Sequence, residues 1–240
     1  PHIGATTVEA QQDVGVTIAE QVIKGIKGEI VPNAVNLPGI ATDELKKMKP
    51  YIELMEKLGK LYYQLNSYPV KNVNIVYWGD IVKFDTEMLE IAFLKGLLEQ
   101  VNNDRVNYIN AKMTAEQSGI SIRRQKMKEH YNNYSSLITI KITNNAGEKF
   151  TLSGTVSNKQ EGKLVEIEGY EVDVKPSEYM LFVKNKDVPG VIGQVGTIVG
   201  QENINVATMQ VGRKVKGEMA IMILNVDSEI SKESLDKFKQ

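Results

Sequence analysis

The sequence contains no cysteine among its 240 residues. Disulfide bonds, zinc–thiolate sites, iron–sulfur ligation and thiol catalysis are therefore excluded within it. This absence fits a cytosolic protein, and we expect a cytoplasmic location. Only two histidines occur, and neither pairs with an Asp or Glu in a way that suggests metal ligation, so we expect no metal site.

A strong excess of charge is also missing, because the formal net charge is -1. Nothing in the overall charge attracts nucleic acid or an anionic membrane, and we expect neither as a partner. No apolar run approaches the ~18 residues that a membrane-spanning helix needs. The first residues form no signal peptide and include no initiator Met, which favours a chain cut from a larger protein. The apolar fraction of 42% suffices for folded cores.

The N-terminal region has the pattern of one helix followed by a connector. Val and Ile recur every four residues between Thr7 and Gly28, which is a helical spacing. Thr6 or Thr7 is suited to cap the start of this helix, and Gly28 its end. Residues 30–39 contain two prolines and a glycine, which favours an extended connector and a domain boundary.

The middle region, residues 41–176, has the pattern of an α+β domain, in which helices precede antiparallel strands. We expect a helix over 43–66 in two pieces, broken before Pro50, because proline suits a first helical turn. Two more helices are predicted over 86–101 and 111–118. The strands that we expect are 73–78, one that starts at 120–122, 137–142, 150–156, 164–167 and 172–174.

The C-terminal region, residues 177–240, begins after a boundary at Pro176-Ser177. Its pattern predicts the order β-α-β-β-α, and one more strand would complete a ferredoxin-like β-α-β-β-α-β unit. The last strand is missing from the sequence, so we expect the C-terminus to be cut as well. The predicted elements are strand 179–183, helix 190–200, strands 204–211 and 218–226, and helix 232–239.

A candidate binding site for a small amino acid surrounds the first turn of this region. Asp187 precedes Pro189-Gly190, and the amides of Val191 and Ile192 then lie at a helix N-terminus, which favours a carboxylate. Asp187 is placed to accept an ammonium group, and Asn205 offers both a donor and an acceptor. The alternative is ordinary turn chemistry for these residues. The glycines at 190, 193 and 196 lack the spacing of a dinucleotide-binding loop.

Residues 179–226 resemble an ACT domain, which binds amino acids at a side-by-side dimer interface. The resemblance lies in Asp187-Val188-Pro189-Gly190-Val191-Ile192-Gly193 and in the segment 203–207. In family members that bind L-serine, the positions that match Asp187 and Asn205 contact the effector from opposite subunits. The position that matches Asn185 also lies in that site. The resemblance thus implies L-serine as a ligand and a homo-oligomer formed through the ACT domain.

The N-terminal segment, Pro1 to Gln11, resembles the part of D-3-phosphoglycerate dehydrogenase that bears the catalytic histidine. The middle region resembles the allosteric substrate-binding, or intervening, domain of the long form of that enzyme. The resemblance implies that residues 1–40 are the remnant of a Rossmann-type catalytic domain and its connector. It also implies that His2 is the catalytic acid/base of an NAD-dependent enzyme that oxidises 3-phospho-D-glycerate at the head of serine synthesis. NAD would be bound by an upstream part, and we expect this fragment alone to be inactive.

The same resemblance implies an anion site for phosphate or 3-phosphoglycerate in the middle domain. The matching positions hold Lys163, Tyr170 and Lys175, and Tyr170 departs from the basic pattern of the family. The alternative is that both lysines are solvated charges at a strand edge.

Three hypotheses for the region remain open. In the first, L-serine bridges two ACT domains and regulates catalysis. In the second, the ACT and middle domains serve oligomerisation alone, with the strand at 204–211 pairing across a two-fold axis. In the third, the chain is the regulatory half of an iron–sulfur L-serine dehydratase, against which the motif around His2 argues.

Overall fold

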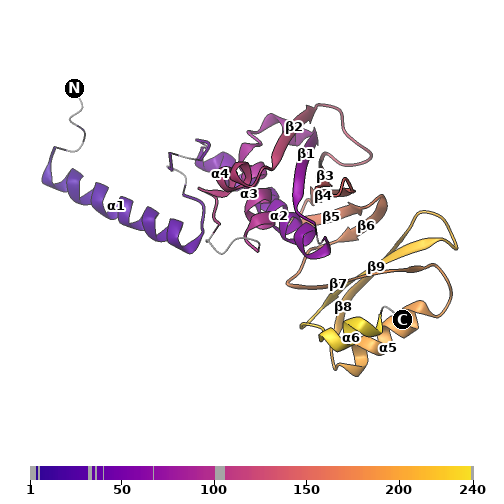
Figure 1. The fold of residues 1–240 in the computed structure, drawn as a ribbon. Helices are drawn as coiled ribbons and strands as arrows, with labels where there is room; N and C mark the ends of the chain where they lie inside the picture. Colours follow the sequence, from indigo (N-terminus) through magenta and orange to yellow (C-terminus); the bar gives the residue numbers. More distant parts are fainter. Residues whose placement is uncertain are drawn as a thin grey trace. The chain divides into compact units, whose positions relative to one another are not determined.

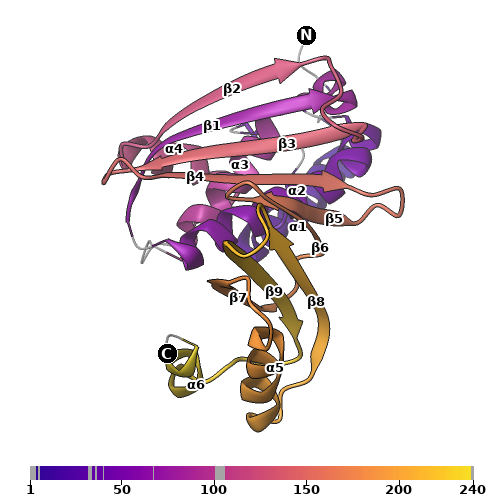
Figure 2. The same cartoon turned by 90° about the vertical axis from the view of Figure 1, so that its right-hand side faces the viewer.

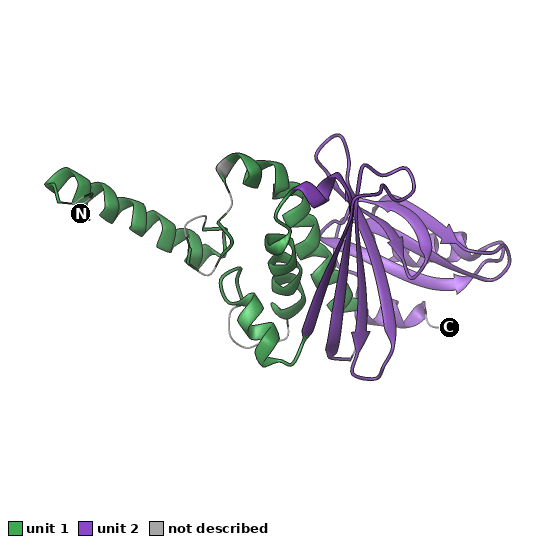
Figure 3. Cartoon of the chain, turned by 90° about the horizontal axis from the view of Figure 1, so that it is seen from above, with its two compact units in different colours: residues 1–67, 84–120 green, residues 68–83, 121–240 purple. Residues whose placement is uncertain are grey.

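The computed structural model describes residues 4, 6–31, 34–35, 37–39, 41–66, 68–100 and 106–238. They form two compact units, which Figure 3 colours separately: residues 1–67 with 84–120, and residues 68–83 with 121–240. The first unit contains the helices α1 (Val8–Lys27), α2 (Thr42–Leu65), α3 (Glu87–Leu98) and α4 (Ala111–Gln117). The second contains the short 3-10 helix η1 (Asp80–Lys83), the strands of both sheets, and the helices α5 (Val191–Gln201) and α6 (Lys232–Lys237) (Figure 1).

Helix α1 begins and ends at the residues that the sequence predicts. The Thr7 hydroxyl accepts a hydrogen bond from the backbone N–H of Ala10 at 3.2 Å. Gly28 has a left-handed φ of 77°, and its N–H donates to the Gly25 carbonyl at 3.0 Å. Such caps satisfy backbone groups that a helix end leaves unpaired.

Helix α2 is continuous from Thr42 to Leu65 and contains Pro50 in its interior, so the predicted break before Pro50 is wrong. Proline removes one helical hydrogen bond and costs about 3 kcal/mol in a helix interior. Met48 and Ile52, which flank it, are 0% and 1% exposed. Burial of side chains of this size contributes roughly 1.5–3 kcal/mol each, which offsets the cost of the proline.

Helices α2 and α3 cross at two glycines. A Cβ atom placed on Gly96 would lie 2.0 Å from the Glu56 carbonyl oxygen, and one on Gly59 would lie 2.2 Å from the Phe93 carbonyl oxygen. Any side chain at either position would therefore push the two backbones apart.

A charged network is built beside this crossing. The Glu56 carboxylate accepts hydrogen bonds from Lys95 Nζ and the Tyr108 hydroxyl, each at 2.6 Å, and pairs with Lys60 at 3.0 Å. Lys95 is only 7% exposed. Burial raises the pKa of Glu56. The hydrogen bonds from Lys95, Tyr108 and Lys60 together lower it by more than burial raises it, so the pKa lies below the ordinary value.

A six-stranded sheet runs in the order β2-β1-β3-β4-β5-β6 (Figure 2). Only β2 pairs in parallel, with β1, and every other neighbouring pair in this sheet is antiparallel. The bounds are β1 (Val70–Gly79), β2 (Ser121–Met127), β3 (Ser136–Asn144), β4 (Lys149–Val156), β5 (Gly162–Ile167) and β6 (Tyr170–Val174). The strands predicted for this region are confirmed, with ends that differ by a few residues.

A second, three-stranded antiparallel sheet has the order β7-β9-β8. Its elements are β7 (Tyr179–Lys186), α5 (Val191–Gln201), β8 (Val206–Arg213), β9 (Met219–Val226) and α6 (Lys232–Lys237), which confirms the predicted order β-α-β-β-α. One apolar core joins the sheet to α5. Its buried members are Leu181, Val183, Val195, Val199, Ile204, Met222, Leu224 and Val226.

The predicted α+β class is therefore confirmed, with an ACT-like second sheet. The Rossmann remnant expected over residues 1–40 stays a prediction, because the described part of that range contributes only α1 and irregular backbone. No helix in the described ranges has the length and apolar character to cross a membrane.

Candidate effector site and anion site

Asp187 follows β7, and its carboxylate is already partly engaged. Its Oδ2 atom accepts a hydrogen bond from the Gly217 backbone N–H at 3.2 Å and lies 3.4 Å from Arg213 Nη1. Its side chain is 23% exposed. In the described part of the chain, no hydrogen bond or ion pair reaches its other oxygen, Oδ1. The sequence analysis did not identify Arg213 or Gly217, although three basic residues, Arg213, Lys214 and Lys216, lie close together there.

The N-terminus of α5 is open, because no side chain caps it. Gly190 stands at the cap position with a φ of 95°, which glycine adopts without strain. The amides of Val191 and Ile192 lie in the first turn, where a helix has no partner of its own for them. Ile192 is 55% exposed, so this turn is accessible.

The two asparagines have different surroundings. Asn185 lies in β7, where its Nδ2 donates to the Lys186 carbonyl at 2.8 Å and its Oδ1 is buried without a partner among the described residues. Asn205 precedes β8 and is exposed, and its Nδ2 lies 3.2 Å from an Asp227 carboxylate oxygen.

Asp187 and Asn205 lie at opposite ends of one sheet. Lys186 pairs with Met219 at the start of β9, whereas Val206 pairs with Val226 at its end. Seven residues of strand span roughly 23 Å. A single amino acid cannot touch both side chains within one chain.

Both lysines of the expected anion site form ion pairs with neighbouring carboxylates. Lys163 Nζ lies 2.8 Å from Asp173 Oδ1, and Lys175 Nζ lies 2.6 Å from Glu161 Oε1. The hydrogen bond from Lys175 lowers the pKa of Glu161. Tyr170 is buried, and the Lys214 ammonium lies 4.5 Å from the centre of its ring. The structure thus places both lysines near the same strand pair but supplies each with a carboxylate.

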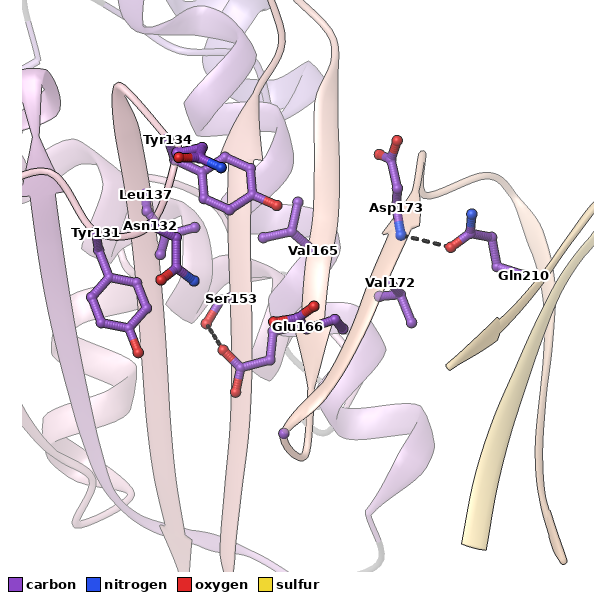
Figure 4. A pocket seen from close by; sticks show the side chains of 13 residues that line it. Tyr131, Asn132, Tyr134, Leu137, Ser153, Val165, Glu166, Val172, Asp173 and Gln210 are labelled. Carbon is purple, nitrogen blue, oxygen red and sulfur yellow. Dashed lines mark hydrogen bonds between the residues drawn. The ribbon is translucent and has the colours of Figure 1, made fainter. Parts of the chain in front are cut away.

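A cavity of about 730 Å³ lies beside these strands (Figure 4). It is lined by Tyr134 and by the carboxylates Glu166, Glu171 and Asp173, and no basic residue lines it. Burial, followed by the charges of Asp173 and Glu171, raises the pKa of Tyr134. Glu166 accepts a hydrogen bond from the Ser153 hydroxyl at 2.9 Å (Figure 4). This negative lining disfavours anions.

His2 lies outside the described residues, so its predicted catalytic role stays a prediction. In the ranges that the structure describes, no cluster of His, Asp or Glu could hold a metal ion.

Two family models match the chain. The model of the D-3-phosphoglycerate dehydrogenase intervening domain matches residues 47–168, about half of the chain. This chain belongs to the D-3-phosphoglycerate dehydrogenase family. The ACT domain model matches residues 179–240, and the family is one of NAD-dependent oxidoreductases.

Relatives in this family come from bacteria, archaea and plants. The D-3-phosphoglycerate dehydrogenase of Bacillus subtilis is 39% identical over 230 residues, which cover 96% of this chain and 43% of the relative. That of Methanocaldococcus jannaschii is 37% identical over 242 residues and covers 100% of this chain and 45% of the relative. D-3-phosphoglycerate dehydrogenase 3, chloroplastic, of Arabidopsis thaliana is 35% identical, covering 99% and 43%. The chain spans less than half of each of these relatives and corresponds to their C-terminal part.

Proposed function

We propose that this chain is the regulatory region of a D-3-phosphoglycerate dehydrogenase, which oxidises 3-phospho-D-glycerate with NAD in the first step of L-serine synthesis. The match to the intervening domain and the relatives of the same name support this proposal. Residues 41–176 would form the intervening domain and 177–240 the ACT domain. NAD would be bound by a part of the relatives that this chain does not cover.

In this proposal L-serine binds between two ACT domains. Its carboxylate accepts hydrogen bonds from the open amides of Val191 and Ile192, where the helix dipole also favours a negative charge. Its ammonium group contacts Asp187 through Oδ1, because Oδ2 already serves Gly217 and Arg213. Its hydroxyl contacts Asn205 of the partner subunit. The observation that carries this arrangement is that Asp187 and Asn205 lie at opposite ends of the sheet.

Strand β8 offers the edge that such a pairing needs. It is an outer strand of the three-stranded sheet, bonded to β9 on one side. If two copies of β8 pair antiparallel about a two-fold axis, the start of one strand meets the end of the other. The start carries Asn205, and the end carries Arg213, which contacts Asp187. The pairing therefore brings the two halves of the site to one place.

Regulation requires that L-serine bind one arrangement of the enzyme more tightly than another. Paired ACT domains would be held together by the ligand, and the intervening domain would transmit that change to the catalytic part.

A mixing experiment tests the shared site directly. Asp187→Ala and Asn205→Ala each remove one half of every site, so calorimetry should detect no L-serine binding to either variant alone. After the two variants are mixed and allowed to exchange subunits, half of the dimers are mixed, and each of these has one intact site. Binding capacity should return to about a quarter of that of the unchanged protein.

A mixture that restores no binding, although both variants fold and dimerise, would refute the shared site. Unchanged L-serine binding by Asp187→Ala alone would refute the role of that carboxylate. Far-ultraviolet circular dichroism and sedimentation of each variant provide the controls for folding and assembly.

Oligomerisation without an effector is the second candidate function. The ion pair between Arg213 and Asp187 favours it, because the acidic group already has a counterion. Under this alternative the protein binds no L-serine, while Asp187→Ala leaves the dimer unchanged.

A further inference from the structure

The loop that joins β8 to β9, residues 214–218, is held by Asp187 on one side. The Asp187 carboxylate accepts a hydrogen bond from the Gly217 backbone N–H at 3.2 Å and lies 3.4 Å from Arg213 Nη1, at the end of β8. The Asp187 backbone N–H also donates to the Glu218 carbonyl at 2.7 Å. Three contacts therefore link the position of this loop to the carboxylate that receives the ligand ammonium group in the proposed function.

The same loop contacts the six-stranded sheet on its other side. The Lys214 ammonium lies 4.5 Å from the centre of the Tyr170 ring, at the start of β6. A Cβ atom placed on Gly169, in the turn before β6, would lie 3.0 Å from Lys214 Nζ. Glu168 and Gly169 have φ angles of 52° and 76°, the pattern of a tight two-residue hairpin turn. Lys214 thus packs against a turn whose backbone conformation is well defined.

Strand β8 itself meets β6 next to this loop. A Cβ atom placed on Gly212 would lie 2.9 Å from the Glu171 carbonyl oxygen, so a glycine permits this close approach. Gln210 lies two residues earlier, on the same face of β8, and its Oε1 accepts a hydrogen bond from the Asp173 backbone N–H at 2.8 Å (Figure 4). All of these residues belong to the second compact unit.

The residues that contact β6 and its turn are the chain neighbours of Arg213. Gly212 precedes it and Lys214 follows it, and consecutive Cα atoms lie at a fixed separation of about 3.8 Å. A ligand ammonium group at Asp187 places a second positive charge beside Arg213 and competes with it for the carboxylate. A shift of Arg213 is then passed directly to both neighbours and so to β6.

We propose that residues 210–214 couple the effector site to the six-stranded sheet, with Lys214 as a positioning residue that acts through Tyr170. This inference rests on the proposed binding of L-serine at Asp187. In the empty protein, Asp187 and Tyr170 hold the loop together. Binding of the ammonium group loosens the first contact, and the loop moves away from β6. Because coupling is reciprocal, the contact at Tyr170 also sets the affinity for a ligand that it does not touch.

Amide hydrogen exchange of the 240-residue chain, followed by mass spectrometry, measures this coupling. L-serine should speed exchange in peptides that cover β6, where the Asp173 N–H bonds to Gln210. Asp187→Ala should have the same effect without ligand, because it removes the acceptor of Gly217 and the partner of Arg213. Peptides from β3, inside the same sheet, are the internal control and should not change.

Calorimetry with L-serine tests the role of Lys214. Lys214→Met removes the cation over Tyr170, so the loop moves at a lower cost and L-serine should bind about two- to fivefold more tightly. Damage to the fold would weaken binding instead. Lys214→Arg keeps a cation over the ring and should restore the affinity of the unchanged protein. Lys216→Met is the matched control, because it removes one exposed charge from the same loop without an ion pair or ring contact in the described ranges.

Two results would overturn the coupling and leave the proposed function intact. One is L-serine binding that leaves exchange in β6 unchanged. The other is a folded Lys214→Met protein that binds L-serine as Lys216→Met does. If the unchanged protein binds no L-serine at about 10 mM, the proposed function fails instead. Exchange in Asp187→Ala then still decides whether the carboxylate and β6 are connected, and unchanged exchange there would refute the connection.

Discussion

Replacement of Gly96 by alanine tests how closely α2 and α3 must approach. The added Cβ would lie 2.0 Å from the Glu56 carbonyl oxygen and 2.8 Å from its carbon, both parts of the α2 backbone. A real contact of this kind is about 3 Å or longer, so α2 has to retreat by roughly 1 Å. Overpacking of this sort typically costs about 1–3 kcal/mol.

Two further effects contribute to the change in the free energy of unfolding caused by Gly96→Ala. Movement of α2 weakens the bond between Lys95 and Glu56, and a hydrogen bond to a charged group contributes roughly 1.5–3 kcal/mol. Alanine also gains about 1 kcal/mol over glycine in a helix interior. We therefore expect the free energy of unfolding to fall by about 3 kcal/mol.

Urea denaturation followed by far-ultraviolet circular dichroism measures this change. The matched control is Gly196→Ala in α5, where a Cβ meets nothing within 4 Å and stability should rise by up to about 1 kcal/mol. The double variant with Gly59→Ala should cost less than the two single changes together, because one separation of the helices accommodates both methyl groups. A Gly96→Ala protein within about 0.5 kcal/mol of the unchanged one would refute the reasoning.

Two more predictions concern ion pairs. The pKa of Glu56 is lowered in the folded state, so its ionised carboxylate stabilises the fold. This stabilisation is complete above the pKa of the unfolded chain, about 4.3, and is lost as the pH falls through the pKa of the folded protein. Glu56→Gln should remove this pH dependence and lower the free energy of unfolding by about 3 kcal/mol at neutral pH, since Lys95 stays buried without its partner. Urea denaturation at a series of pH values from acid to neutral measures the change. A loss of stability at acid pH that is the same in both proteins would contradict the prediction. Asp173→Asn frees Lys163, the lysine of the predicted anion site, and should strengthen phosphate binding in calorimetry; no gain would show that this ion pair does not suppress the site.

Local features of this fold were predictable from sequence. Thr7 and Gly28 act on backbone groups within four residues, so their capping roles follow from the residues alone. The β-α-β-β-α order likewise follows from apolar periodicity and turn residues. Pro50 was misjudged because burial on both sides of it, which depends on distant parts of the chain, outweighs its local preference.

The candidate sites depend on residues that are distant in sequence. Arg213 meets Asp187 only because β7 and β8 both flank β9, and no local pattern fixes that contact. Lys163 looked free in the sequence, but the pairing of β5 with β6 brings Asp173 to it.

The placement of Asp187 and Asn205 at opposite ends of one sheet has a consequence for the cell. If every binding site is built from residues of two chains, a single chain cannot bind the amino acid. Sensitivity to L-serine then depends on how much enzyme is present, and dilution of the protein weakens the response. By the same reciprocity, abundant L-serine holds together pairs of chains that would otherwise separate.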